Sequence, residues 1–228
     1  MVIKPYQMKK IYLLIVFIST SLFAQQNPNI KASVWGNVEK SKKIYISPNL
    51  EKEIKNHHII AVLPFNVLIQ YKKIPKNYSA SSNKKAEMDL SNNIQSELYA
   101  ELSDKNKNYT VEIQNIEATN QILKDSNMLN LQNYSPTQVA KTLKVDALIY
   151  GSYVYIKVGS EGSAMLSQLL IGDGKVAVGE LDMKIYNGPD GELLWSINKA
   201  MNQDALSSPK RIIDRMMNKL GRNFPYKK

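Results

Sequence analysis

The 228-residue sequence contains no cysteine. Disulfide bonds, thiolate nucleophiles and zinc sites with cysteine ligands are therefore excluded. The bacterial lipoprotein anchor is excluded as well, because its lipid is attached to a cysteine directly after the signal cleavage site. Stability must come from the apolar core, and the chain is long enough to bury one sizeable core.

Histidine is also scarce, and the two histidines, His57 and His58, are adjacent. Neighbouring side chains on a strand point to opposite faces, so this pair is unsuited to hold one metal ion. The sequence has no G-x-S-x-G nucleophile elbow, and the segment 172–175 lacks the spacing and the hydroxyl residue of a phosphate-binding loop. We therefore expect no metal, no cofactor and no enzymatic activity.

The first 24 residues have the pattern of a bacterial secretory signal peptide. Three lysines precede an apolar block at residues 11–18, and a small residue, Ala24, ends the segment. A membrane-spanning helix needs about 20 apolar residues, whereas this block loses its apolar character at residues 19–21. We expect cleavage after Ala24 and export to the periplasm, either free or associated with the outer membrane; a retained anchor is the alternative.

Acidic residues are too few to balance the basic ones: 30 Lys and Arg face 20 Asp and Glu, for a net charge of +10. The excess of lysine favours anionic partners such as a membrane surface or a cell-wall polymer, and export argues against nucleic acid. The lysines are spread along the chain, however. A solvated surface is therefore the competing interpretation.

The hydrophobic pattern predicts alternating strands and helices. The β-branched, apolar run at 58–65 predicts a central strand that is interrupted at Pro64. Apolar residues at three- and four-residue spacing over 88–102 predict an amphipathic helix, and the capping residues at 135–138 predict the start of another. Further strands are expected at 109–113, 145–156, 175–186 and 193–200, with a hairpin turn at 187–191, and further helices at 118–124 and 209–220.

The expected order is strand, helix, strand, two helices, three strands and a terminal helix. An α/β fold with a single mixed sheet and flanking helices fits this order. We expect a signal peptide at residues 1–24, an N-terminal extension at 25–57 in which residues 43–46 can add a strand, and one α/β domain at 58–228.

Four short motifs carry a resemblance to a known family. They are Ile60-Ala61-Val62-Leu63-Pro64-Phe65, Leu143-Lys144-Val145-Asp146-Ala147-Leu148-Ile149-Tyr150-Gly151-Ser152, Lys184-Ile185-Tyr186 and Gly191-Glu192-Leu193-Leu194-Trp195. Their order and spacing over residues 58–220 resemble the envelope superfamily that includes the curli-secretion pore lipoprotein and the outer-membrane lipoprotein activators of penicillin-binding proteins.

The resemblance implies a periplasmic α/β domain that works by binding, as an accessory to assembly, export or peptidoglycan synthesis. This chain departs from the family in lacking the cysteine that anchors typical members. Residues 159–174 are also too short, and alternate too little, for a membrane-spanning hairpin. We therefore predict no pore.

Two segments are candidate partner-binding surfaces, and a sheet edge is a third candidate. The first segment is a basic, serine-rich loop expected at 70–85, and the second is an apolar run at 163–171 bounded by glycines. A short helical turn that covers the sheet end is the competing interpretation of the apolar run. The candidate residues are Lys72, Lys73, Lys76, Lys84 and Lys85 in the first segment and Met165, Leu166, Leu169 and Leu170 in the second.

The leading hypothesis is an exported, non-catalytic accessory protein that binds an envelope protein or forms a homo-oligomer. The alternatives are an exported enzyme with a site assembled from scattered residues and a module that binds a small ligand or lipid. A cleft with convergent Asp, His or Tyr side chains would favour the enzyme, an apolar cavity the ligand, and an exposed patch the docking protein.

Overall fold

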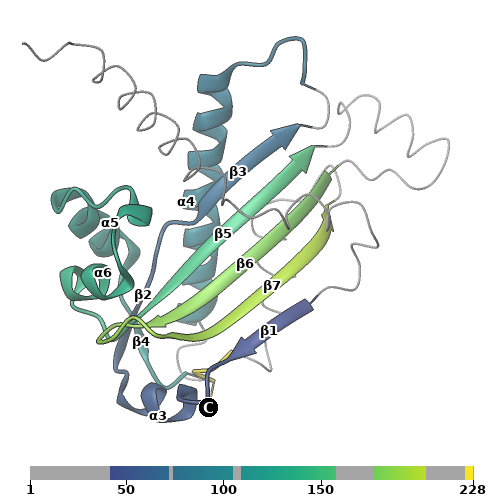
Figure 1. Cartoon of the computed structure of the whole chain (residues 1–228). Helices are drawn as coiled ribbons and strands as arrows, with labels where there is room; N and C mark the ends of the chain where they lie inside the picture. The colour runs from purple at the N-terminus through teal and green to yellow at the C-terminus, as the bar shows by residue number, and fades with distance from the viewer. Residues whose placement is uncertain (1–41, 72–73, 105–108, 158–176, 204–223, 228) are drawn as a thin grey trace, which may run out of the picture. The chain divides into compact units, whose positions relative to one another are not determined.

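A seven-stranded mixed sheet organises the chain, as the computed structural model shows (Figure 1). The structure describes residues 42–71, 74–104, 109–157, 177–203 and 224–227. The strands are β1 (Lys42–Ile46), β2 (Ile59–Val62), β3 (Asn66–Tyr71), β4 (Glu112–Ile113), β5 (Ala147–Lys157), β6 (Ala177–Asn187) and β7 (Leu193–Gln203). The helices are α3 (Leu50–Glu53), α4 (Ala80–Asp104), α5 (Ile116–Asp125) and α6 (Pro136–Leu143), with short 3-10 turns at Ile54–Asn56 and Leu131–Asn133.

The sheet has the order β1-β7-β6-β5-β2-β4, and β3 pairs with β5 beyond the end of β2. β2 and β3 run parallel to β5, which is long enough to pair with both. The strands β5, β6, β7 and β1 are antiparallel neighbours. The α/β class, the single mixed sheet and its flanking helices are therefore as the sequence predicts.

The predicted interruption at Pro64 is present, because β2 ends at Val62 and β3 begins at Asn66. Proline has no backbone N–H and cannot donate to a sheet ladder. The chain then continues as a second strand, which the sequence did not predict. Gln70 and Tyr71, which we expected at the start of a basic loop, belong to β3. Their backbones are ordered by pairing with the second half of β5.

The hairpin between β6 and β7 is confirmed, and its turn follows Asn187. Gly191 has φ +76°, a left-handed conformation that favours glycine. The capping box at the start of α6 is also confirmed, because Ser135 Oγ accepts from the Gln138 N–H and Gln138 Oε1 accepts from the Ser135 N–H. The strand expected at 109–113 is shorter than predicted and reduces to β4, with an isolated bridge from Tyr109 to Lys227.

Helices pack on both faces of the sheet. In Figure 1, α4 runs beside β3 and behind β5, while α5 and α6 are grouped at the amino end of β5. The side chains that fill the first interface include Ile94, Leu98 and Leu102 of α4 with Ile60, Val62 and Ile149 of the sheet. The second interface contains Leu123, Val139 and Leu143 of the helices with Ala61, Leu63 and Leu148 of the sheet. Each buried aliphatic side chain stabilises the fold by about 1.5–3 kcal/mol.

The remaining predicted segments lie outside the described residues. These are the signal peptide at 1–24, the apolar run at 163–171 and the terminal helix at 209–220. The strand expected at 43–46 is confirmed as β1, which pairs with β7 at one edge of the sheet. None of the helices in the described part of the chain is both long and apolar enough to cross a membrane.

Candidate functional site

A groove of about 540 Å³ lies beside the interruption between β2 and β3. One wall is α4, the opposite wall is the end of α5 with residues 128–132, and the floor is the chain at 64–67. We call it the α4–α5 groove. Its position beyond the carboxyl end of a parallel strand is where open α/β sheets place ligands, and its volume falls within the range of about 300–1,000 Å³ of binding pockets.

The wall formed by α4 is held in place by a stripe of four polar side chains that recur every four residues. Such residues share one face of a helix. This face lies against the backbone at the outer edge of β2 and β3. Asn83 Nδ2 donates to the Ile69 carbonyl (3.2 Å), Glu87 Oε1 accepts from the Ile69 N–H (3.0 Å), Ser91 Oγ donates to the Phe65 carbonyl (2.6 Å) and Gln95 Nε2 donates to the Val62 carbonyl (2.8 Å).

This polar stripe has two consequences. The edge of β3 at Ile69 is already bonded to α4, so the helix protects that edge from pairing with another strand. The neighbouring face of α4, which carries Lys84, Met88 and Asn92, is turned toward the groove. The helix therefore uses one face for the core, one for the strand edge and one for the groove.

An amide pair joins the two walls. Gln95 Nε2 donates to Asn120 Oδ1 at 3.0 Å, and Asn120 Nδ2 donates to Gln95 Oε1 at 3.0 Å. Gln95 is 1% exposed, and its amide also bonds to Val62. A single buried side chain thus connects α4, α5 and β2, which fixes the width of the groove.

The floor is set by a close contact between Phe65 and Gly151. A Cβ atom at residue 151 would lie only 2.1 Å from Phe65 Cε1, so the ring occupies space that only glycine leaves open. Ser91 holds the Phe65 carbonyl from the other side. These two contacts fix the position of Phe65 in the floor.

The charge that the groove presents to solvent is positive. Among the described residues that line it, the titratable side chains are Lys84, Glu87 and Lys124. Glu87 is 7% exposed, and its carboxylate accepts hydrogen bonds from the Ile69 N–H and from Asn83. The exposed lysines stand on opposite walls, Lys84 on α4 and Lys124 on α5.

Two large apolar side chains of the lining are exposed to solvent. Met88 is 58% exposed and Leu129 is 75% exposed, and they lie on opposite walls above the buried Phe65 and Leu123. No Asp, His or Tyr occurs among the described lining residues. The arrangement is suited to bind apolar side chains.

The lysines predicted as site residues are not in a single loop. Lys84 and Lys85 lie in the first turns of α4, which corrects the loop expected at 70–85. Lys84 lines the groove, whereas Lys85 forms an ion pair with Asp89 at 3.0 Å. Lys76 is exposed ahead of the helix. The other predicted site residues, Lys72, Lys73, Met165, Leu166, Leu169 and Leu170, lie outside the described residues.

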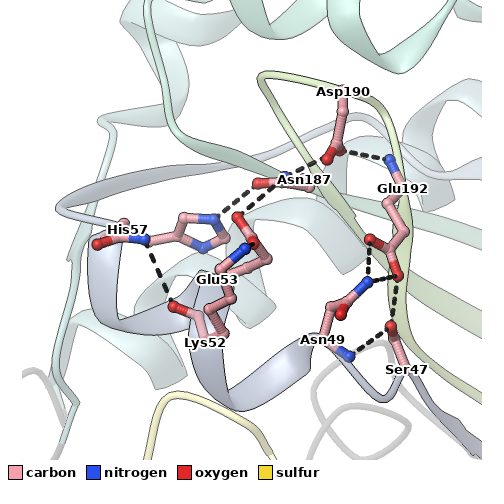
Figure 2. Close-up of polar contacts among 9 residues, drawn as sticks. Ser47, Asn49, Lys52, Glu53, His57, Asn187, Asp190 and Glu192 are labelled. Atoms are coloured by element: carbon pink, nitrogen blue, oxygen red, sulfur yellow. Dashed lines mark hydrogen bonds and ion pairs between the residues drawn. The ribbon is translucent and has the colours of Figure 1, made fainter.

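A second polar cluster connects the segment around α3 to the β6–β7 turn (Figure 2). Asn49 Nδ2 donates to Glu192 Oε2 at 3.1 Å, and Ser47 Oγ donates to the same carboxylate. Asp190 Oδ1 accepts from Asn187 Nδ2 and from the Glu192 N–H, both at 2.8 Å. Because these carboxylates are bonded within the cluster, we assign it a structural role.

His57 is a buried member of this cluster, as are Ser47 and Asn187. It is 5% exposed; Nε2 lies 2.9 Å from Asn187 Oδ1 and Nδ1 lies 2.7 Å from the Tyr226 hydroxyl. Because Asn187 Oδ1 is an acceptor, His57 Nε2 donates to it, and Nδ1 is paired with the Tyr226 hydroxyl. His58 is exposed, and its backbone N–H donates to Asp146 Oδ2 at 2.7 Å.

The two histidines therefore point to different environments, as expected. Among the described residues, no group of three or more His, Cys, Asp and Glu is placed to hold a metal ion. Sequence reasoning missed the groove itself. The four-residue spacing of Asn83, Glu87, Ser91 and Gln95 was the signal that could have identified one of its supports.

No family model matches this chain, and no curated protein matches it. Solved structures that align with this chain include the lipoprotein GNA1162 from Neisseria meningitidis, with a TM-score of 0.43 and 13% sequence identity; the alignment covers 73% of this chain and 98% of that one. The PelC dodecamer from Paraburkholderia phytofirmans aligns with a TM-score of 0.41 and 11% sequence identity. This alignment covers 82% of this chain and 96% of that one. The LpoB C-terminal domain from Salmonella enterica aligns with a TM-score of 0.34 and 12% sequence identity. This alignment covers 68% of this chain and 94% of that one. At these scores and identities, the similarities assign neither a family nor a function.

Proposed function

We propose that this chain is an exported, non-catalytic accessory protein of the cell envelope and that it binds a protein partner in the α4–α5 groove. The observation that carries the proposal is the lining of the groove. Exposed apolar side chains lie on two walls that are joined by partly buried hydrogen bonds. The signal-peptide pattern at 1–24 and the resemblance over 58–220 support the envelope location.

A second role is favoured by a separate observation, the exposed basic residues near the start of α4. Lys76, Lys84 and Lys85 are all exposed, and Lys72 and Lys73 are close to them in sequence. We propose that these lysines bring the protein to an anionic membrane surface or cell-wall polymer. In this account the lysines aid localisation and the groove selects the partner, and Lys84, which also lines the groove, contributes to both roles.

A small apolar ligand is the alternative occupant, because the volume of the groove also suits a small molecule. A small ligand and a protein partner would give different results when the purified protein is examined. A bound small molecule would appear in the native mass spectrum of the purified protein as a fixed mass increment. A protein partner would be lost on dilution or would co-purify as a second chain.

The test is chemical cross-linking in cells that express the tagged protein, followed by mass spectrometry of the attached species. We compare the wild type with Leu129→Arg, which places a charge in the groove, and with Ile74→Arg as a matched control. Ile74 is 68% exposed and lies outside the groove lining. The account expects a specific envelope protein with the wild type and the control, and its loss with Leu129→Arg. Equal recovery in all three would contradict it.

A further inference from the structure

We infer that the α4–α5 groove recognises a peptide segment in which large apolar side chains are flanked by acidic residues. This inference rests on the proposed function and specifies the chemistry of the partner. It is drawn from three properties of the lining: its apolar anchors, its side-chain amides and the sign of its exposed charge.

The apolar anchors line the groove from two different elements. Met88 projects from α4 and Leu129 from the segment after α5, with exposed fractions of 58% and 75%. Beneath them, Phe65 and Leu123 are 3% and 2% exposed. A side chain that enters between the walls would be covered on both sides, and methionine adapts its shape to varied apolar side chains.

The amides at the rim distinguish a peptide from a lipid chain. Asn92, Asn130 and Gln132 line the groove and are exposed. A side-chain amide carries both a donor and an acceptor, which matches the N–H and C=O groups of a peptide backbone. An acyl chain would displace water from these amides without replacing their hydrogen bonds, which costs free energy.

The positive charge at the rim of the groove favours a peptide that carries acidic residues. Lys124 makes no ion pair among the described residues, and Lys84 is 71% exposed at 3.5 Å from Glu87. Oε1 of the Glu87 carboxylate accepts from the Ile69 N–H and from Asn83, and Oε2 accepts from Lys84, which leaves two exposed lysines against one nearly buried carboxylate. The two lysines therefore determine the sign of the rim, one from each wall, and acidic groups on either side of the apolar anchor would meet them.

The experiment selects binders from a random-sequence peptide library displayed on phage, using the purified protein as bait. The inference expects enriched peptides that combine large apolar residues with an excess of Asp and Glu. Each enriched peptide is then measured by fluorescence anisotropy against the wild type, Lys84→Glu, Lys124→Glu and the control Lys141→Glu, whose residue is exposed on α6. Circular dichroism and thermal unfolding verify that each variant is folded, and Lys124→Glu alone suffices if Lys84→Glu perturbs α4.

We expect each groove variant to weaken binding by about tenfold and the control to leave it unchanged. Replacing the acidic residues of the peptide by lysine should restore binding to Lys124→Glu. Peptides that require Leu129 but show no acidic excess and no response to Lys84→Glu or Lys124→Glu would overturn the charge inference and leave the proposed function standing. No enrichment, or binding that Leu129→Arg does not affect, would overturn both.

Discussion

His57 Nδ1 lies 2.7 Å from the hydroxyl of Tyr226, which is 169 residues further along the chain. Both side chains are buried, and Tyr226 also packs against Phe224. The backbone carbonyl of Tyr226 accepts from the Thr110 N–H at 3.0 Å. The C-terminal residues 224–227 are thus joined to the segments that precede β2 and β4.

The substitution Tyr226→Phe, which removes the phenol hydroxyl, tests the hydrogen bond between Tyr226 and His57. Removal of the hydroxyl leaves the buried Nδ1 of His57 without its hydrogen-bond partner, so we expect a loss of about 1–3 kcal/mol in the free energy of unfolding. Urea denaturation of the variant and the wild type measures the loss. Tyr78→Phe serves as the control, because Tyr78 is 43% exposed. An unchanged stability of Tyr226→Phe would show that the His57–Tyr226 hydrogen bond contributes nothing measurable.

The amide pair between the groove walls predicts an energetic coupling. We expect Gln95→Ala and Asn120→Ala each to destabilise the fold, and the double variant to lose less than the sum. The coupling should be about 0.5–1.5 kcal/mol, as for a hydrogen-bonded pair in contact. A double-mutant cycle by chemical denaturation measures it. Strict additivity would mean that the two walls are not linked through these amides.

Asp146 predicts a pH dependence of stability. Burial acts to raise the pKa of its carboxyl, but hydrogen bonds from the Ile59 and His58 N–H groups and the electrostatic effect of the two histidines outweigh burial, and the pKa is lowered from 3.8. A carboxyl whose pKa is lowered by folding stabilises the fold above its unfolded pKa, and this contribution disappears as the pH falls through the folded pKa.

The matched variant for this carboxyl is Asp146→Asn. Between about pH 6 and about pH 2.5, the wild type should lose more unfolding free energy than the variant, because the variant has no carboxyl to protonate at this site. Denaturation curves at both pH values measure the difference. Parallel losses would show that Asp146 does not contribute to the acid sensitivity of the fold.

The basic residues around the start of α4 predict a salt-sensitive association with anionic surfaces. Replacing Lys72, Lys73, Lys76, Lys84 and Lys85 by Gln should weaken vesicle binding by about tenfold or more at low salt without unfolding the protein. Co-sedimentation with anionic vesicles measures this. The control replaces five lysines in other parts of the chain that are exposed, Lys43, Lys52, Lys55, Lys141 and Lys144. Unchanged association of the first variant at low salt would contradict the role of these lysines.

The elements predicted best are those with local signals. The capping box at Ser135 and Gln138 and the turn around Gly191 depend on residues close in sequence, so their chemistry is visible without the fold. The early start of α4 was missed because its serines are also typical of loops. In the structure, the Ser82 N–H donates to Ser79 Oγ at 3.3 Å, which is the pattern of a helix cap.

The groove depends on contacts that sequence patterns do not reveal. Met88 was placed beside the apolar stripe of its helix, but the polar stripe at Glu87, Ser91 and Gln95 turns it toward solvent. The partners of that stripe are backbone groups of β2, β3 and the chain between them. Backbone groups have no sequence signature, so the position of α4, and with it the groove, requires the folded structure.

The most direct test of the account is photo-cross-linking in cells from a benzophenone amino acid placed at Met88. This residue is exposed in the groove, so a partner bound there lies within reach of the probe. A probe at Lys141, exposed on α6, is the control. The account predicts one envelope protein cross-linked from Met88, through a segment with apolar and acidic residues, and none from Lys141. The same products from both positions, or none from Met88 in a folded and exported protein, would contradict binding in the α4–α5 groove.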